Sequence, residues 1–285
     1  SIGTLTLNVE AKGTGFDPAT ANATASGIIE RAEYNSYVYK DLKIEGTIAD
    51  GDMTASAEMD DPNIDFGLDI SGNFQGEYPS LQLEGDLRNI ALDSINLYGY
   101  PLRLEGKIKA DLETADPDHL NGEIFLTEFI AENRGERFPL DSIVIRSTAT
   151  AEIDSITLSS QFLQAKMKGD YQLTKVGTAI SQTIESFYNA TPIYDTTSIE
   201  PQQFTFEVNL RDDPVLTHLM PDLELMQPVN ISGRFNSATD SLVINGHIPR
   251  MRFMGYRIVN GDINIETRDG LLAYDIIIDD VEGPQ

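Results

Sequence analysis

Cysteine is absent from the 285 residues of this sequence, and so is tryptophan. A chain without cysteine has no disulfide framework, no thiolate zinc site and no cysteine nucleophile. The sequence also has no run of apolar residues long enough to cross a bilayer as a helix. The lack of cysteine does not fix the compartment, because a periplasmic protein can simply avoid this residue.

Histidine is scarce, with three residues: His119 in an expected turn, His218 in an expected short helix and His247 in an expected strand. A zinc site or a catalytic triad would need these residues to converge with suitable partners. The Gly-x-Ser-x-Gly, P-loop, dinucleotide-binding and His-Glu-x-x-His motifs are also missing. We therefore predict that the protein is not an enzyme and has no catalytic residues, no metal and no cofactor.

Basic residues are few, 20 against 46 acidic ones, which gives a formal net charge of −26. So acidic a surface repels phosphate backbones and anionic membrane surfaces, which argues against nucleic-acid binding and flat membrane docking. The charge is interpreted mainly as solubilising. Recruitment of cations or of a basic partner is the functional alternative.

Two groups of carboxylates have alternative interpretations. Asp50 with Asp52, and Asp60 with Asp61 and Asp65, offer clustered oxygen atoms that calcium could bind. Their spacing matches no EF-hand loop, and Asp before Gly or Pro is common in turns. The turn interpretation is favoured, and calcium binding stays open. A glycosidase could also use two acids, but acids in so acidic a chain are unspecific evidence.

What the sequence does contain is one repeated amphipathic phrase. In 39–48, apolar Leu42, Ile44 and Ile48 alternate with polar residues, and Gly46 falls on the apolar parity. Alternation with period two predicts a strand with one dry face and one wet face. Fuller or shorter copies of the phrase occur at 68–74, 78–87, 102–108, 165–171, 229–235 and 242–248. The chain is thus an array of related strands without a fixed period.

The remaining elements follow from the same alternation and from turn signals. Strands are predicted from 2 to 174, including one at 92–97, with residues 16–26 as a loop or weak strand, and again from 204 to 210 and from 229 to the end. Helical spacing of apolar residues predicts an amphipathic helix at about 176–189. Asp213 and Pro214 form an N-cap and N1 pair for a short helix near 214–220. Asp269 and Gly270 indicate a last hairpin. The two helices are expected to cover sheet surface that the strands leave open.

The segment 165–263 carries a family resemblance. Its order is Gly169-Asp170-Tyr171, an amphipathic helix, the strand 204–210, the short helix 213–220, Pro221-Asp222-Leu223 and the strands from 229 onwards. This order resembles the TamB-type translocation and assembly module subunit of Bacteroidetes, within the AsmA-like superfamily. The resemblance is a pattern of strands and not a catalytic signature.

The resemblance implies a fold, a function and a location. It implies an all-β, mainly antiparallel, elongated curled sheet that forms an open groove (a β-taco), with one amphipathic and one short helix. Such a groove carries lipid or shelters hydrophobic segments of outer-membrane proteins between the inner and outer membranes. The partner it implies is a BamA-like outer-membrane barrel protein. The chain would be an internal, periplasmic portion of a longer protein, anchored to the inner membrane by a segment outside this sequence.

The predicted organisation has three segments: 1–175 as groove repeats, 176–222 as a helical cover with an intervening loop and strand, and 223–285 as a continuation of the groove. The predicted groove floor consists of Leu42, Ile44, Gly46, Leu81, Leu83, Gly85, Leu102, Leu104, Gly106, Ile244 and Gly246. An inward glycine lets a ligand or another side chain come close. Either the missing side chain sets the width of the groove at these glycines, or it makes room for core packing.

The alternative to the groove is a β-sandwich or β-helix surface module that binds carbohydrate or protein. It is motivated by the acidic surface and by two groups of aromatic residues, Tyr34, Tyr37 and Tyr39, and Tyr98 with Tyr100. These tyrosines could form a ligand platform, although strand aromatics more often pack across neighbouring strands and shield glycines. The shape of the sheet separates the two readings, because a closed sandwich would leave no apolar face open.

Overall fold

The computed structural model describes residues 2–150, 153–188, 199–268 and 270–283. As predicted, the fold is all-β and mainly antiparallel, with an open sheet and two α-helices. The chain divides into two compact units. The first unit comprises residues 1–116 and 120–144, and the second comprises residues 117–119 and 145–285. The three-segment organisation proposed from the sequence stays a prediction.

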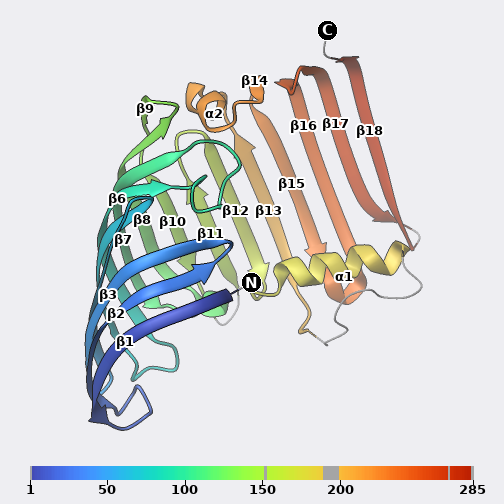
Figure 1. The fold of residues 1–285 in the computed structure, drawn as a ribbon. Coiled ribbons are helices and arrows are strands. Elements are labelled where there is room, and N and C mark those ends of the chain that lie inside the picture. Colours follow the sequence, from blue (N-terminus) through green and yellow to red (C-terminus); the bar gives the residue numbers. More distant parts are fainter. Residues whose placement is uncertain (1, 151–152, 189–198, 269, 284–285) are drawn as a thin grey trace. The chain divides into compact units, whose positions relative to one another are not determined.

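The first unit is a meander of nine strands (Figure 1). They are β1 Ile2–Thr14, β2 Asn22–Tyr34, β3 Tyr37–Ala49, β4 Asp52–Asp61, β5 Ile64–Asn73, β6 Ser80–Ala91, β7 Arg103–Thr114, β8 Asn121–Asn133 and β9 Glu136–Pro139. Each strand pairs antiparallel with the next. Hairpin-connected neighbours of this kind follow directly from the short turns that the sequence places between amphipathic strands.

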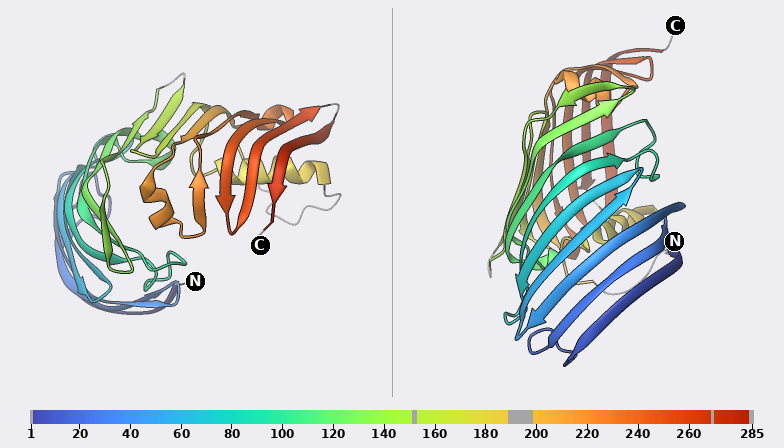
Figure 2. Two further views of the ribbon diagram at one scale, coloured as in Figure 1. Left: turned by 90° about the horizontal axis from the view of Figure 1, so that it is seen from above. Right: turned by 60° about the vertical axis from the view of Figure 1, so that its left-hand side comes forward.

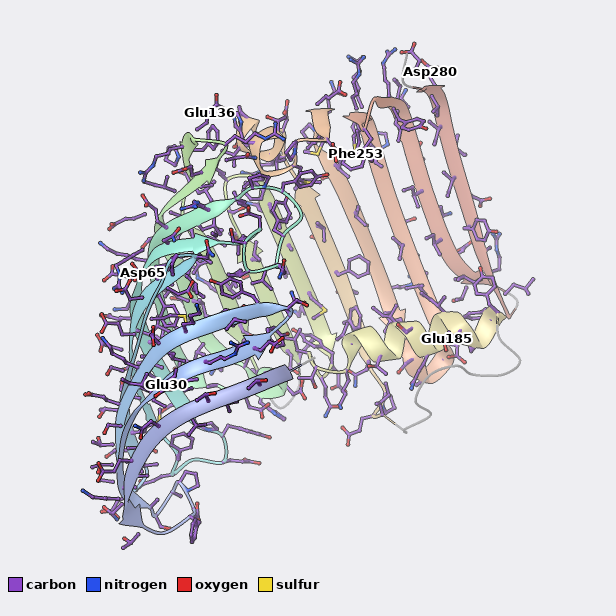
Figure 3. All side chains as sticks on the ribbon, in the orientation of Figure 1. Glu30, Asp65, Glu136, Glu185, Phe253 and Asp280 are labelled. Carbon is purple, nitrogen blue, oxygen red and sulfur yellow. The ribbon has the colours of Figure 1, made fainter. Side chains whose placement is uncertain are left out.

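The strands of the first unit are bent along their length (Figure 2). Their registers shift between Asp65 and Phe66 on β5, between Leu87 and Ile90 on β6, and at two places where β7 pairs with β8. A bulge puts an extra residue in one strand, and this bends the strand and increases its twist. Oxygen- and nitrogen-bearing side chains stand along the outer side of the bend (Figure 3).

The second unit is a sheet in which β11, β12, β13, β15, β16, β17 and β18 pair antiparallel in that order. Their bounds are β11 Asp154–Ser159, β12 Leu163–Asp170, β13 Gln203–Leu210, β15 Val229–Asn236, β16 Ser241–Phe253, β17 Tyr256–Arg268 and β18 Leu271–Glu282. The short β14 Leu223–Met226 pairs with β16, and β10 Ile143–Thr148 contains the boundary between the units. Two 3-10 turns, η1 Pro117–His119 and η2 Ser237–Thr239, complete this unit.

The helices are α1 Val176–Tyr188 and α2 Pro214–Leu219, close to the predicted ranges. The predicted cap of α2 is confirmed, since the Asp213 carboxylate accepts a hydrogen bond from the backbone N–H of Val215 at 2.9 Å. Residue 189, where the sequence ended the first helix, and Asp269 of the last predicted hairpin lie outside the described residues. Neither helix, nor any other in the described part of the chain, has the length and hydropathy needed to cross a membrane.

One strand prediction is wrong. Residues 92–97 form a succession of turns between β6 and β7. Backbone hydrogen bonds from Leu97 and Tyr98 to the carbonyl of Leu92 close the loop, and Leu92 donates to the carbonyl of Leu102. The loop replaces a strand because it can bury the Ile95 side chain, which is 1% exposed. Residues 16–26, predicted as a loop or weak strand, contain a loop up to residue 21 and then the start of β2 at Asn22.

Candidate apolar binding face

The apolar residues of the first unit share one face of the sheet. In β3, Leu42, Ile44, Gly46 and Ile48 are half-buried, whereas the residues between them are exposed. The same alternation occurs in β6 around Leu83 and in β7 around Ile108. Side chains two positions apart in a strand lie on the same side of the sheet. The parity assigned from the sequence therefore describes the real faces of these strands.

Cross-strand register brings four predicted floor residues of the first unit, Ile44, Gly46, Leu83 and Gly85, into two adjacent rows. One row runs Gly46, Ala55, Ile70, Leu83 and Ala110, and the next runs Ile44, Ala57, Leu68, Gly85 and Ile108. We call these ten residues the first apolar face. Most of its side chains are half-buried, with only Ala110 buried. Neighbouring side chains in the same sheet bury an apolar row only in part, and a second layer packed on the row would bury it further.

The predicted floor omits six members of these rows, namely Ala55, Ala57, Leu68, Ile70, Ile108 and Ala110. They occupy the same alternating positions as the residues that were chosen. Their alternation with polar residues is visible in the sequence, but the glycine-containing phrase covers only part of each strand. Leu42, Leu81 and Leu104 lie on the same side but outside the two central rows.

Leu102 does not belong to an open floor. It precedes β7, and its side chain is 6% exposed. Its carbonyl accepts the hydrogen bond from Leu92 that closes the loop 92–101. The loop is also tied to the β2–β3 turn, because Asn35 and Asn96 each donate a side-chain hydrogen bond to the other's backbone carbonyl, at 2.6 and 3.1 Å. Leu102 is thus part of a packed end of the unit.

The glycines on the apolar side differ in what fills the space of the missing side chain. A Cβ atom on Gly106 would lie 2.3 Å from the ring of Phe129, and one on Gly85 would lie 2.3 Å from a methyl group of Leu68. These two glycines make room for neighbouring side chains. At Gly246 the nearest atoms would be 3.7 Å away, which is ordinary contact. Only Gly246 of these three therefore leaves space that a ligand can use.

The substitution Gly106→Leu is expected to lower the free energy of unfolding by about 1–3 kcal/mol, because it overpacks the buried Phe129 ring. Urea unfolding measures the change. Gly99→Leu is the control, since no atom lies within 4 Å of a Cβ there. An unchanged midpoint for Gly106→Leu, together with weaker binding of an apolar ligand, would show that this glycine sets the width of a groove instead.

The second unit has an equivalent apolar face. One row runs Ala165, Val208, Ile231, Gly246, Ile263 and Ile276, and the next runs Met167, Phe206, Gly233, Ile244, Ile265 and Tyr274. We call these twelve residues the second apolar face. It contains both predicted floor residues of this unit, Ile244 and Gly246. On β18 the face is open, with Tyr274 64% and Ile276 60% exposed.

Helices border the second apolar face at the two ends of its strands (Figure 1). At one end, Ala179 of α1 packs with Phe204, Phe235 and Leu242. At the other end, Leu216 of α2 packs with Leu223, Met226 and Val229. Both helices therefore contribute buried residues to the core at the strand ends. Burial at the α1 end raises the pKa of Tyr171 to about 12, so its hydroxyl is neutral at physiological pH.

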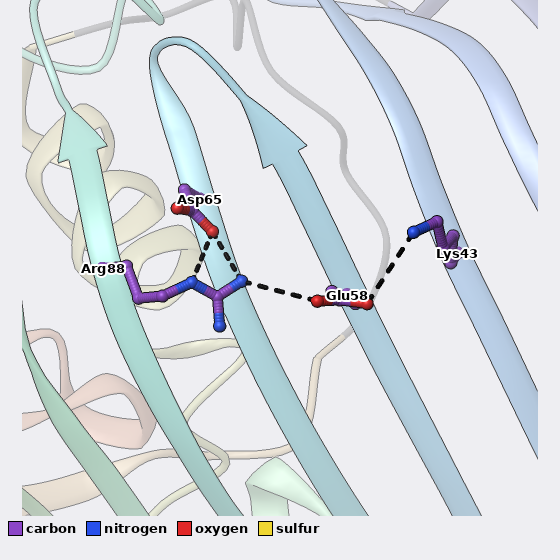
Figure 4. A network of polar contacts seen from close by, with 4 residues as sticks. All are labelled: Lys43, Glu58, Asp65 and Arg88. Atoms are coloured by element: carbon purple, nitrogen blue, oxygen red, sulfur yellow. Dashed lines mark hydrogen bonds and ion pairs between the residues drawn. The ribbon is translucent and has the colours of Figure 1, made fainter.

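The opposite face of each unit is polar. In the first unit Arg88 lies between two carboxylates, 2.5 Å from Asp65 and 3.9 Å from Glu58, and Glu58 also lies 3.9 Å from Lys43 (Figure 4). The ion pair with Asp65 raises the pKa of Arg88 further. Such exposed pairs contribute little to stability. These exposed pairs of opposite charge show that this face of the sheet is in contact with solvent.

The aspartates proposed as calcium ligands are engaged in turns and cross-strand hydrogen bonds. Asp50 accepts from Asn22 at 3.1 Å, Asp52 from Asn73 at 2.7 Å, and buried Asp61 from Tyr37 and from the backbone of Asn63. Among the residues that the structure describes, no group of three or more potential metal ligands is found. The geometry supports the turn interpretation of these acids.

Four of the five tyrosines proposed as a platform pack in edge-to-face pairs, whereas Tyr34 is 52% exposed. The rings of Tyr37 and Tyr39 are 4.9 Å apart, and those of Tyr98 and Tyr100 are 5.7 Å apart. All four side chains are half-buried. Each pair lies within one segment, β3 or the loop 92–101, and packing of these rings on each other accounts for them better than a platform that presents its rings to a ligand.

The three histidines lie on separate elements, His119 on η1, His218 on α2 and His247 on β16. Of these, His247 has a carboxylate neighbour, with its Nδ1 2.7 Å from Oδ1 of Asp262. Sequence reasoning missed this pair, because it depends on which residues of β16 and β17 lie opposite one another.

No family model, curated protein or solved structure matches this chain. The assignment of a function therefore rests on the two faces themselves.

Proposed function

We propose that this protein is a non-enzymatic component of cell-envelope biogenesis whose apolar faces bind the acyl chains of lipids. The observation that carries the proposal is the second apolar face, whose residues are half-buried from β12 to β17 and exposed on β18, at Tyr274 and Ile276. Soluble proteins rarely leave so continuous an apolar patch exposed unless it binds something. The resemblance to TamB-type proteins supports transfer of lipid between inner and outer membranes, a periplasmic location and a BamA-like partner.

Acyl chains suit this face better than a peptide does. Two of the twelve residues in its rows are glycines, and of the ten side chains only that of Tyr274 carries a hydroxyl, amide or charged group. A peptide lying across it would leave backbone N–H and C=O groups without partners, and each such group costs free energy on burial. An acyl chain has no such groups. Sheltering of hydrophobic segments of outer-membrane proteins is the second candidate, and competition by an apolar peptide tests it.

Gly246→Leu is expected to weaken binding of a dansyl-labelled fatty acid about tenfold, because the added side chain displaces roughly two methylene groups from the face. The melting temperature should be unchanged, since a Cβ atom at this position meets nothing closer than 3.7 Å. Fluorescence titration measures the affinity.

Asn245→Leu is the matched control. It adds the same side chain one position away on the same strand, where the residue is exposed on the polar face. It should bind the fatty acid as the parent does. Equal binding by the parent and by Gly246→Leu would rule out the second apolar face as the acyl site.

A further inference from the structure

The polar face of the second unit contains a shallow depression of about 510 Å³ that crosses β15, β16, β17 and β18. Two rows of opposed residues line it, together with Gly246 and Ile263, which lie between the rows. One row runs Ser232, Asn245, Asn264 and Asp275, and the other runs Asn230, His247, Asp262 and Ile277. All eight are exposed, whereas Ile231, Gly246 and Ile263 between them are half-buried toward the apolar face. The depression is therefore separated from the proposed acyl site by the thickness of the sheet.

The imidazole of His247 is hydrogen-bonded at one of its two ring nitrogens. Its Nδ1 lies 2.7 Å from Oδ1 of Asp262, its direct neighbour on β17. An ionised carboxylate only accepts hydrogen bonds, so Nδ1 donates the proton. The other ring nitrogen, Nε2, is then left to accept a hydrogen bond when the ring is neutral. The pair supplies an oriented acceptor within a lining that is otherwise made of short side chains.

The lining mixes donors and acceptors. Each of the three asparagine amides both donates and accepts, the Ser232 hydroxyl does the same, and the two aspartates accept. A ligand that matches this set must itself present several groups that both donate and accept. Hydroxyl groups on adjacent carbons have that property. Phosphates and carboxylates do not, and Asp262 and Asp275 would repel them.

An apolar contact completes the lining. Ile277 on β18 lies opposite Asp262, so this apolar residue is on the polar face, where its side chain is 62% exposed. A sugar ring has C–H groups on its faces and hydroxyl groups around its edge, so it can use both kinds of contact. We propose that this depression binds a neutral saccharide through the asparagine amides, the His247–Asp262 pair and Ile277. The proposal is independent of the acyl-binding function.

Amide-resolved NMR on the whole protein tests the proposal, with maltotriose and chitotriose as two neutral probes that differ in their substituents. At least one probe is expected to give saturable shifts in the amides of residues 230–232, 245–247, 262–264 and 275–277. Both Asn245→Leu and His247→Ala should weaken that binding about tenfold, through the loss of one or two hydrogen bonds. These side chains are exposed, so melting temperatures should be retained.

Gly246→Leu is the matched control, because only the backbone of Gly246 lines the depression and the added side chain projects from the apolar face, so saccharide binding should stay intact. The two variants are reciprocal. Gly246→Leu should weaken fatty-acid binding and keep saccharide binding, and Asn245→Leu should do the reverse. Absence of shifts with both saccharides would overturn the proposal. So would shifts that persist unchanged in Asn245→Leu and His247→Ala, or shifts caused by calcium chloride but by neither saccharide.

Discussion

Phe235→Ala is expected to lower the free energy of unfolding by about 3–5 kcal/mol, the usual range for removing a buried phenylalanine. Phe235 is 1% exposed and is one of the largest fully buried side chains of the described residues. Its ring lies 5.3 Å from that of Phe204, which in turn lies 6.0 Å from Tyr171. The alanine variant leaves a cavity between the sheet and α1 that neighbouring strands cannot close, because their registers are set by many backbone hydrogen bonds.

Urea unfolding followed by near-ultraviolet circular dichroism measures this loss through the tyrosine and phenylalanine signals. Tyr256→Ala is the control, since Tyr256 is 53% exposed and surface changes usually stay within about 0.5 kcal/mol. If the two compact units unfold in separate transitions, only one transition should move. A loss below about 1 kcal/mol would mean that α1 is not packed on the sheet as described, because cavity formation in a fixed core costs more.

Ile95→Ala is expected to have the next largest effect, a loss of about 2–5 kcal/mol. Ile95 belongs to the loop 92–101 and is 1% exposed, whereas Leu97 in the same loop is 57% exposed. Leu97→Ala should therefore change stability little. Thermal unfolding of the two variants compares them directly.

This pair also distinguishes the loop from the strand that alternation predicts there. In a strand, residues 95 and 97 lie on the same face and are buried to a similar degree. Similar losses for Ile95→Ala and Leu97→Ala would support the strand and contradict the loop. A large loss for Ile95→Ala alone agrees with the loop, in which the turns at Leu92 direct the two side chains differently.

Local rules predicted most of the elements. Alternation in 39–48 identified both faces of β3, because side chains in any strand point to opposite sides in turn. Asp213 and Pro214 predicted the start of α2, since a cap requires only the residues at the helix end. The open sheet was one of two possibilities, and the half-burial of the apolar rows among the described residues favours it.

The same local rules could not settle positions where two parts of the chain meet. Leu92–Leu97 alternates like a strand, yet burial of Ile95 makes it a loop. Leu102 has the same pattern as Leu104 but lies under that loop. In both cases the free energy of burying a side chain in a packed end exceeds the small preference of the local sequence for an extended conformation.

The sequence by itself determined which residues share a face, because the period of a strand is a property of consecutive residues. Only the tertiary structure decided what stands beside each of them. Gly46, Gly85, Gly106 and Gly246 are alike in the sequence, but Phe129 fills the space at Gly106 and little fills it at Gly246. His247 and Asp262 are 15 positions apart and become neighbours through the register of β16 and β17. Register depends on turn lengths, bulges and packing across the whole sheet, so it is not contained in the alternation of any single strand.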